Sequence, residues 1–307
     1  MIRLARPSKA RLRTWTPGLA AALLLLACAM PALDLPRDTV DAVVVFDITQ
    51  SMDVRDVELD GARASRLEFA RESARRALRG LPCGSRIGWA AFTEYRTLLL
   101  LAPIEVCGNY GDLLATLSHV DGRMRWGNAS EVSKGVFWAM RAARELDPKP
   151  ALVFVSDGQE SPPLGESGAP MFDDLAPGQI HGWLAGVGGP APMPIPRSDA
   201  EGRPLGWWRA QDVIQRTPVA GRPPSHEQLS ELHDGHLRGL AAQVGFDYAT
   251  LDDASALGRL LRDPRLARRV PVPTDVSWLP AALALALLAW HFRPDVRPRR
   301  VSRTSGT

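Results

Sequence analysis

The sequence has little cysteine, with three residues in 307, and no pair is spaced as Cys-x-x-Cys. A dithiol redox motif is therefore excluded. No serine, histidine and aspartate show a spacing that argues for catalysis, and the Gly-rich stretch at 186–190 follows the wrong strand for a dinucleotide loop. No internal repeat is visible either. A length of 307 residues with 45% hydrophobic content predicts one main domain, and we expect it to be a binding protein, not an enzyme.

Acidic residues are missing from residues 1–33, which carry five basic residues, and residues 293–307 carry five arginines against one aspartate. The stretch between them, 34–292, has 27 basic and 33 acidic residues and a formal charge of −6. The sequence pI near 9.0 therefore comes from the two ends of the chain. A nucleic-acid-binding role loses its main support, because the body of the protein is acidic.

Charged side chains are also absent from the two most apolar runs, at 18–33 and 276–292. Each is slightly shorter than the roughly 20 residues that span a bilayer as a helix. The positive-inside rule puts both basic ends in the cytoplasm and everything between them in the periplasm. We therefore expect a protein of the bacterial inner membrane, with a basic start and membrane or signal segment at 1–35, a membrane helix at 274–292 and a basic tail at 293–307.

The first apolar run is open to two other interpretations, because a cleaved signal peptide and a lipoprotein signal ending at Cys28 share its features. All three versions export the body. Export permits a disulfide, and Cys83 and Cys107 are the only pair of cysteines in the exported part. We expect them to be bonded, although two separate buried thiols are also compatible with the sequence.

Apolar runs and amphipathic segments alternate along the body. Runs rich in β-branched and aromatic residues predict buried strands, and apolar residues at three- and four-residue steps predict helices. An α/β fold with a doubly wound, mostly parallel sheet and one antiparallel edge strand follows, in a domain covering 38–270 with a loop insertion at about 190–224. The predicted strands are 42–49, 86–94, 96–103, 150–158 and 180–189, and the predicted helices are 66–81, 109–120 and 130–147. Residues 236–251 predict a helix followed by a short strand.

Oxygen-bearing side chains follow the predicted strands. Asp47, Thr49 and Ser51 alternate in DITQS after the first strand, Ser130 begins a long helix, and Asp157 follows another buried strand. Such side chains meet at one edge of a parallel sheet, and they are the ligands that a hard divalent cation requires. We expect Mg²⁺, with Mn²⁺ or Ca²⁺ as alternatives. One coordination position would remain for an acidic side chain of a protein partner.

Three other interpretations of these polar residues are open. Serine, threonine, aspartate and glycine are also ordinary turn residues at strand ends. A phosphatase of the haloacid dehalogenase type would need a second aspartate where Thr49 stands. His226, His233 and His236 could supply a second metal site, although a solvated loop and helix start explains them equally simply.

The strings DITQS, SEVSKG at 130–135 and SDG at 156–158 resemble the metal-ion-dependent adhesion site of von Willebrand factor A domains. The likeness covers about 42–262. Asp47, Thr49 and Ser51 match the family's Asp-x-Ser-x-Ser, while Ser130 stands for its threonine and Asp157 for its second aspartate. The two exchanges between serine and threonine keep the ligand oxygen. The resemblance implies a metal-dependent protein-binding domain.

A narrower resemblance rests on DITQSMDVRD, SRL at 65–67, LPCGSRIGWAAFTE, APIEVCGNY and VSDGQESPP. These strings are similar to the MxaL-type proteins encoded with periplasmic methanol dehydrogenase, a family implicated in maturation of that quinoprotein and insertion of its calcium. The resemblance implies a membrane-anchored assembly factor whose partner is the dehydrogenase or one of its assembly proteins. The alternative is a general complex-assembly factor that works with a MoxR-like ATPase.

Overall fold

The computed structural model describes residues 9–165, 174–215 and 226–293, with side chains from residue 15 onward. The chain divides into two compact units. One, which we call the body, is residues 37–270, and the other, the terminal unit, is residues 1–36 with 271–307. The predicted tail beyond residue 293 and residues 216–224 of the predicted insertion lie outside the described residues.

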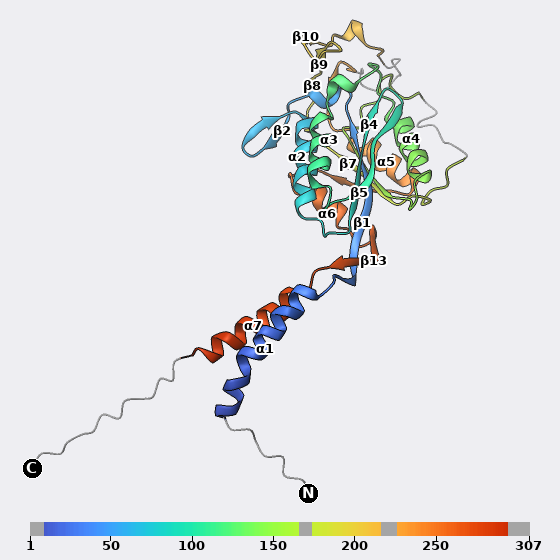
Figure 1. Ribbon diagram of the computed structural model, residues 1–307. Coiled ribbons are helices and arrows are strands. Elements are labelled where there is room, and N and C mark those ends of the chain that lie inside the picture. The colour runs from blue at the N-terminus through green and yellow to red at the C-terminus, as the bar shows by residue number, and fades with distance from the viewer. Residues whose placement is uncertain (1–8, 166–173, 216–225, 294–307) are drawn as a thin grey trace, which may run out of the picture. The chain divides into compact units, whose positions relative to one another are not determined.

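The body is built on a seven-stranded sheet within the described residues. Its strands are β1 (Leu33–Asp47), β4 (Arg86–Thr93), β5 (Arg96–Glu105), β6 (Ala151–Ser156), β7 (Gly182–Gly186), β12 (Asp247–Thr250) and β13 (Ala267–Thr274). They are ordered β12-β7-β6-β1-β4-β5, with β13 paired to β1 (Figure 1). Pairs from β12 to β4 are parallel, and β5 joins β4 antiparallel at the edge. The predicted mostly parallel sheet with one antiparallel edge strand is confirmed.

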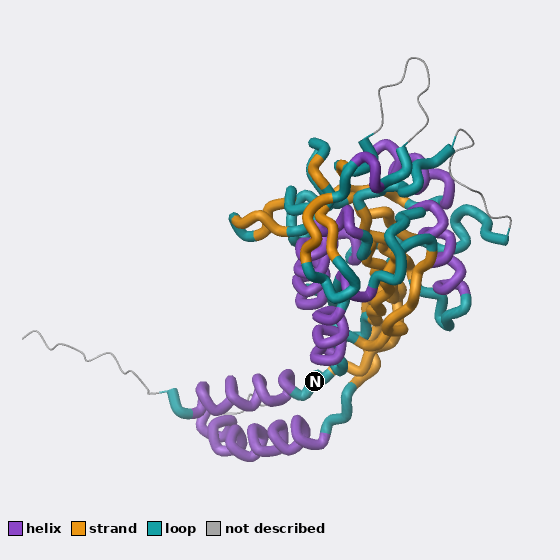
Figure 2. The backbone as a smooth tube through the Cα atoms, turned by 90° about the horizontal axis from the view of Figure 1, so that it is seen from above, coloured by secondary structure: helices purple, strands orange, loops and turns teal. Residues whose placement is uncertain are grey.

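Helices cover both faces of this sheet (Figures 1 and 2). Val44 and Phe46 of β1 pack in one apolar layer, and Val43 and Val45 pack in the other. Alternate residues of a buried strand thus serve opposite layers, as the period of two requires. The first layer contains α2 (Arg66–Arg79), α3 (Tyr110–His119) and α6 (Ala256–Leu261), and the second contains α4 (Val132–Arg144) and α5 (Asp234–Val244).

Two local features of the sequence position α2 and α4. Ser65 caps α2, because its Oγ accepts a hydrogen bond from the Glu68 amide at 3.1 Å and the Glu68 carboxylate accepts one from the Ser65 amide at 2.8 Å. In α4, a Cβ on Gly135 would lie 2.2 Å from the Phe92 ring. Glycine therefore lets α4 approach β4 closely.

The predicted insertion is not a featureless loop. Strands of two to four residues lie within it, too short to leave a periodic pattern in the sequence; two of them pair with each other, and the third pairs with a strand beyond the insertion. A hairpin also occupies the stretch before α2. The sequence of this stretch predicts a polar loop. The short strands are β8 (Met193–Pro194) with β11 (Leu229–Ser230), β9 (Pro196–Ser198) with β10 (Pro204–Trp207), and β2 (Val57–Leu59) with β3 (Ala62–Ala64).

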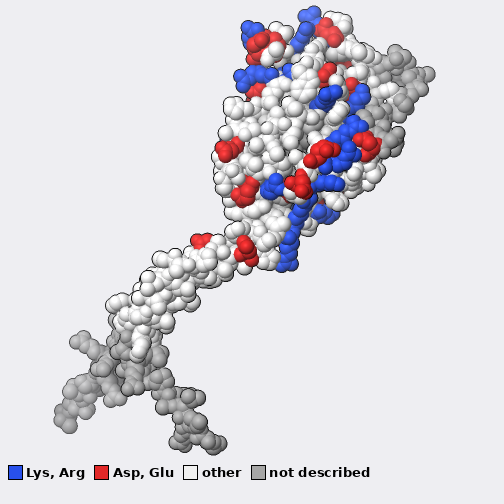
Figure 3. All heavy atoms as spheres, turned by 45° about the vertical axis from the view of Figure 1, so that its right-hand side comes forward, with Lys and Arg blue, Asp and Glu red and all other residues white. Residues whose placement is uncertain are grey.

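The terminal unit contains α1 (Lys9–Ala29) and α7 (Trp278–His291), which cover the two apolar runs. The helices pack together, and Thr16 Oγ1 lies 2.7 Å from His291 Nδ1. Their described side chains include no charged residue, and this part of the surface is white in Figure 3. Within the described residues, no helix combines the length and the apolar character needed to cross a membrane.

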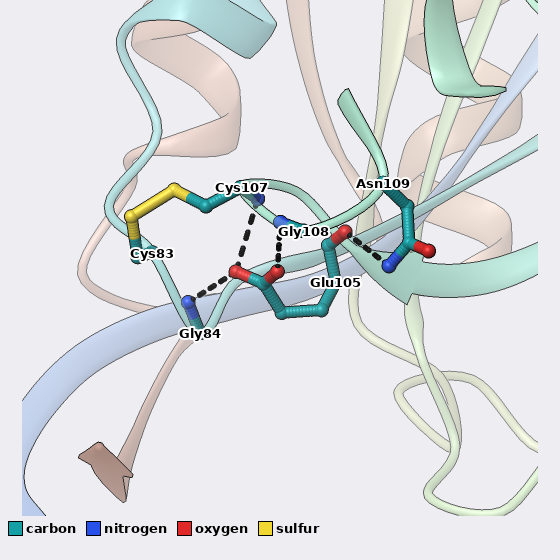
Figure 4. The surroundings of a disulfide bond; sticks show 6 residues. All are labelled: Cys83, Gly84, Glu105, Cys107, Gly108 and Asn109. Carbon is teal, nitrogen blue, oxygen red and sulfur yellow. Dashed lines mark hydrogen bonds between the residues drawn. A yellow bond between two sulfur atoms is a disulfide. The ribbon is translucent and has the colours of Figure 1, made fainter. Parts of the chain in front are cut away.

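Cys83 and Cys107 form a disulfide, with Cα atoms 5.3 Å apart (Figure 4). It joins the loop before β4 to the loop after β5. Beside it, the Glu105 carboxylate accepts hydrogen bonds from the amides of Gly84, Cys107 and Gly108 at 2.8, 3.0 and 2.6 Å. Burial raises the pKa of Glu105, but these three N–H groups outweigh burial and the net pKa is lowered.

Candidate metal centre

The strand-end residues meet at one edge of the sheet. Asp47 is the last residue of β1, and Asp157 directly follows the neighbouring strand β6. Ser156 Oγ donates a hydrogen bond to Asp47 Oδ2 at 2.6 Å, which connects the two strand ends. The carboxyl ends of adjacent parallel strands are where this class of fold forms its ligand sites.

The loop after β1 turns its side chains toward Asp47. The amide and Oγ1 of Thr49 donate to Asp47 Oδ1 at 2.9 and 2.6 Å. Thr49 Oγ1 lies 3.2 Å from Ser51 Oγ. All three side chains are buried. The alternating Asp-x-Thr-x-Ser spacing therefore gathers its oxygens in one cluster, as the sequence predicts.

Ser130 lies beside Thr49 and Ser51 but belongs to a different loop, the one before α4. Its backbone exchanges two hydrogen bonds of 2.7 Å with Ser161, which fixes the residue beside the loop after β6. The Ser130 hydroxyl is buried and has no hydrogen-bond partner among the residues that the structure describes. Together with Thr49 and Ser51, Ser130 lines a pocket of about 210 Å³. An unpartnered hydroxyl in such a place is costly unless a ligand completes it.

Asp157 is held by an arginine that the sequence analysis did not single out as functional. Arg66 is fully buried, and its Nη1 donates to Asp157 Oδ2 at 2.5 Å while its Nη2 donates to Asp56 Oδ2 at 2.6 Å. Ser230 Oγ also donates to Asp157 Oδ2, at 3.0 Å. Amphipathic periodicity assigns the arginines of this helix to the solvent face, and the one other signal at Arg66 is its place in the string SRL at 65–67.

The two carboxylates have matching hydrogen-bond capacity. Asp47 accepts three hydrogen bonds, two from Thr49 and one from Ser156, and Asp157 accepts three, from Arg66, Ser230 and the Gln159 amide. A carboxylate offers about four lone-pair sites. Each of the two groups can therefore accept one more interaction.

The charges of this cluster favour a cation. Burial and the nearby negative charge of Asp157 together raise the pKa of Asp47 to about 7, against the opposing effect of hydrogen bonds from Ser156 and Thr49. Arg66 supplies one positive charge to Asp157 and Asp56 together. The donor set of carboxylates and hydroxyls fits a hard divalent ion such as Mg²⁺.

Of the three histidines that could supply a second metal site, His233 and His236 each lie beside a side chain of the loop after β6. His236 Nε2 lies 3.0 Å from Glu160 Oε1, and His233 Nε2 lies 3.4 Å from Gln159 Oε1. Both belong to the start of α5 or the residue before it. This placement agrees with the simpler interpretation, a helix start beside the loop after β6.

The known proteins whose sequences are similar to this chain have names that state no function. No protein-family model matches it. UPF0353 proteins of Mycobacterium tuberculosis and Mycobacterium bovis are 25% identical over 280 residues, which cover 87% of this chain and 73% of each relative.

Similar solved structures include an aerotolerance-related membrane protein from Bacteroides fragilis, 18% identical with a TM-score of 0.49, covering 74% of this chain and 98% of that one. A von Willebrand factor type A protein from Catenulispora acidiphila is 12% identical with a TM-score of 0.41, covering 76% of this chain and 50% of that one.

Proposed function

We propose that the body is a von Willebrand A-type binding module that uses a divalent metal, without catalysis, to hold an acidic side chain of a protein partner. The buried hydroxyl of Ser130 carries this proposal. It lines one pocket with Thr49 and Ser51 and lacks a partner among the described residues. A metal there would satisfy it and would use the remaining capacity of Asp47 and Asp157.

In this proposal Asp47, Thr49, Ser51, Ser130 and Asp157 hold the ion, directly or through water. Mg²⁺ is the best match to this donor set, and Mn²⁺ or Ca²⁺ are alternatives. When bound, the metal supplies a positive charge that attracts a carboxylate from outside. The chain's own residues fix the ion's position, because Thr49 and Ser156 orient Asp47 while Arg66 orients Asp157.

Titration calorimetry of the full chain with Mg²⁺ and with Mn²⁺ tests the metal site. Ser130→Ala and Asp47→Asn should each weaken binding about tenfold or more. Ser118→Ala removes the hydroxyl of an exposed serine on α3 and should leave binding unchanged. Circular dichroism verifies that each variant is folded. Binding by Ser130→Ala and Asp47→Asn equal to that of the parent would contradict the proposal.

The apolar terminal unit supports a second part of the proposal, attachment to the bacterial inner membrane with the body in the periplasm. Trp15, Leu25, Trp278 and Phe292 are exposed by 79, 72, 62 and 75%, an apolar surface that lipid would cover. Fusions of alkaline phosphatase and of green fluorescent protein after residue 270 separate the outcomes. Phosphatase activity in the membrane fraction is expected, and a fluorescent, phosphatase-negative fusion would refute the periplasmic location.

The narrower proposal, maturation of a quinoprotein methanol dehydrogenase and insertion of its calcium, is supported by the sequence strings alone. Deleting the gene should leave dehydrogenase polypeptide present but inactive and poor in calcium. Asp47→Asn should reproduce that defect at a normal level of the assembly factor. Normal calcium occupancy in the deletion strain would contradict the proposal. Loss of unrelated membrane complexes would favour the general assembly factor that works with a MoxR-like ATPase.

A further inference from the structure

Large exposed apolar side chains of the body gather around the candidate metal centre. Among the described residues of the body, five such side chains are exposed, and one of them, Leu98, lies on the edge strand β5. The other four form what we call the apolar rim: Trp126, Leu205, Trp207 and Ile214, exposed by 48, 56, 59 and 66%.

The apolar rim adjoins the pocket that Thr49, Ser51 and Ser130 line, which we call the metal pocket. Ile214 lines the same pocket as Thr49, Ser51 and Ser130. Trp126 and Leu205 line a second hollow, and the two hollows share Gln50, Asn128 and Trp208 as a common wall. Trp207 precedes Trp208 at the end of β10. Figure 1 shows β8, β9 and β10 together at one end of the body.

Gln50 fixes the rim to the metal-binding loop. This residue stands between Thr49 and Ser51, and its side chain is nearly buried. Gln50 Oε1 accepts hydrogen bonds from Trp208 Nε1 at 2.8 Å and from the Ser198 amide at 3.3 Å. Its Nε2 donates to Asn128 Oδ1 at 3.1 Å. Strands β9 and β10 are therefore docked on the loop that supplies two candidate ligands.

Exposed tryptophans are unusual on a protein surface without a binding role. Scattered apolar side chains need no explanation, but a contiguous group beside a ligand site marks an interaction surface. Tryptophan is also among the residues that contribute most to protein interfaces. Apolar contacts next to a metal-held carboxylate would exclude water from it and strengthen the electrostatic attraction.

We propose that the metal pocket and the apolar rim form one docking surface for a protein segment in which an aspartate or glutamate stands beside bulky apolar residues. The acidic side chain completes the metal's coordination, and its apolar neighbours cover Trp207 and Ile214. This inference rests on the proposed function, because the carboxylate needs the metal. It adds the chemical character of the partner.

A heptapeptide library displayed on phage tests this proposal. Peptides are selected on the immobilised full chain in Mg²⁺, and a parallel selection is carried out in chelator. Enriched peptides should carry aspartate or glutamate within two residues of leucine, isoleucine, phenylalanine or tryptophan. The double variant Trp207→Ser/Ile214→Ser should bind the selected peptides about tenfold more weakly, with Mg²⁺ affinity unchanged in calorimetry. Leu98→Ser, which removes an equally exposed apolar side chain from β5, should bind them as the parent does.

The outcomes separate the two proposals. If Mg²⁺ binds but the selected acidic peptides show no apolar preference, or bind the double variant equally, the docking surface is refuted and the proposed function stands. Peptides selected equally in chelator would also refute it. A dimer of the parent that the double variant dissolves would assign the rim to a second copy of the chain instead. Failure to bind any divalent metal would overturn both proposals.

Discussion

Replacing Arg66 with methionine is the most informative perturbation of the body. The guanidinium is fully buried and lies between two carboxylates, Asp157 with no exposed side-chain area and Asp56 with 7%. Methionine fills similar space but leaves both carboxylates without their ionic partner. Removing one member of a buried ion pair costs about 3–5 kcal/mol. We therefore expect the free energy of unfolding of Arg66→Met to fall by about that amount.

Urea denaturation of the full chain, followed by circular dichroism, measures this change. Arg79→Met removes an exposed arginine from the last turn of the same helix and should cost less than about 0.5 kcal/mol. Mg²⁺ should stabilise Arg66→Met less than it stabilises the parent, because Asp157 then lacks the residue that orients it for the ion. A loss below about 1 kcal/mol for Arg66→Met would refute the assignment of Arg66 as the residue that compensates these buried charges.

Three further predictions concern the frame of the site. Gly135→Ala should lower the free energy of unfolding by about 1–2 kcal/mol in the same denaturation assay, since its Cβ would contact the buried Phe92 ring. Glu105→Gln should lower the free energy of unfolding by about 1–2 kcal/mol at pH 7. Because the pKa of Glu105 is lowered in the fold, the parent loses this stabilisation as pH falls below the ordinary pKa of glutamate and through the lowered one, and the denaturation curves of the two proteins should then converge. Cys83→Ser/Cys107→Ser should lower the free energy of unfolding by about 3 kcal/mol relative to the oxidised parent, because the disulfide joins residues 24 positions apart. An unchanged denaturation midpoint would contradict a structural role of the disulfide.

The sheet could be predicted because its central strands are buried on both faces. Residues 42–46 of β1 include no polar position, which distinguishes a central parallel strand from an amphipathic one. The β4 and β5 hairpin followed from two apolar runs separated by a single polar link. The strand-end residues Asp47 and Asp157 were predictable as neighbours for the same reason, since parallel strands present their carboxyl ends together.

The surroundings of the site were less predictable. Arg66 occupies a position that helical periodicity treats as a surface residue, and only the three-dimensional arrangement of Asp56, Asp157 and Ser230 makes its burial favourable. The strands of the insertion consist of two to four residues, so no alternation identifies them. Gln50 gives no signal of its role as a support for β9 and β10, because its partners lie far away in the sequence.

The groups around Asp157 are assembled from distant parts of the chain, with Arg66 and Ser230 separated by 164 positions. Loop closure over such a distance is slow compared with local helix formation. These contacts require the closure of a long loop, so an unfolded chain has no equivalent of the arrangement around Asp157. An ion bound there would bind the native state alone, so the free energy of unfolding would rise with the concentration of that ion.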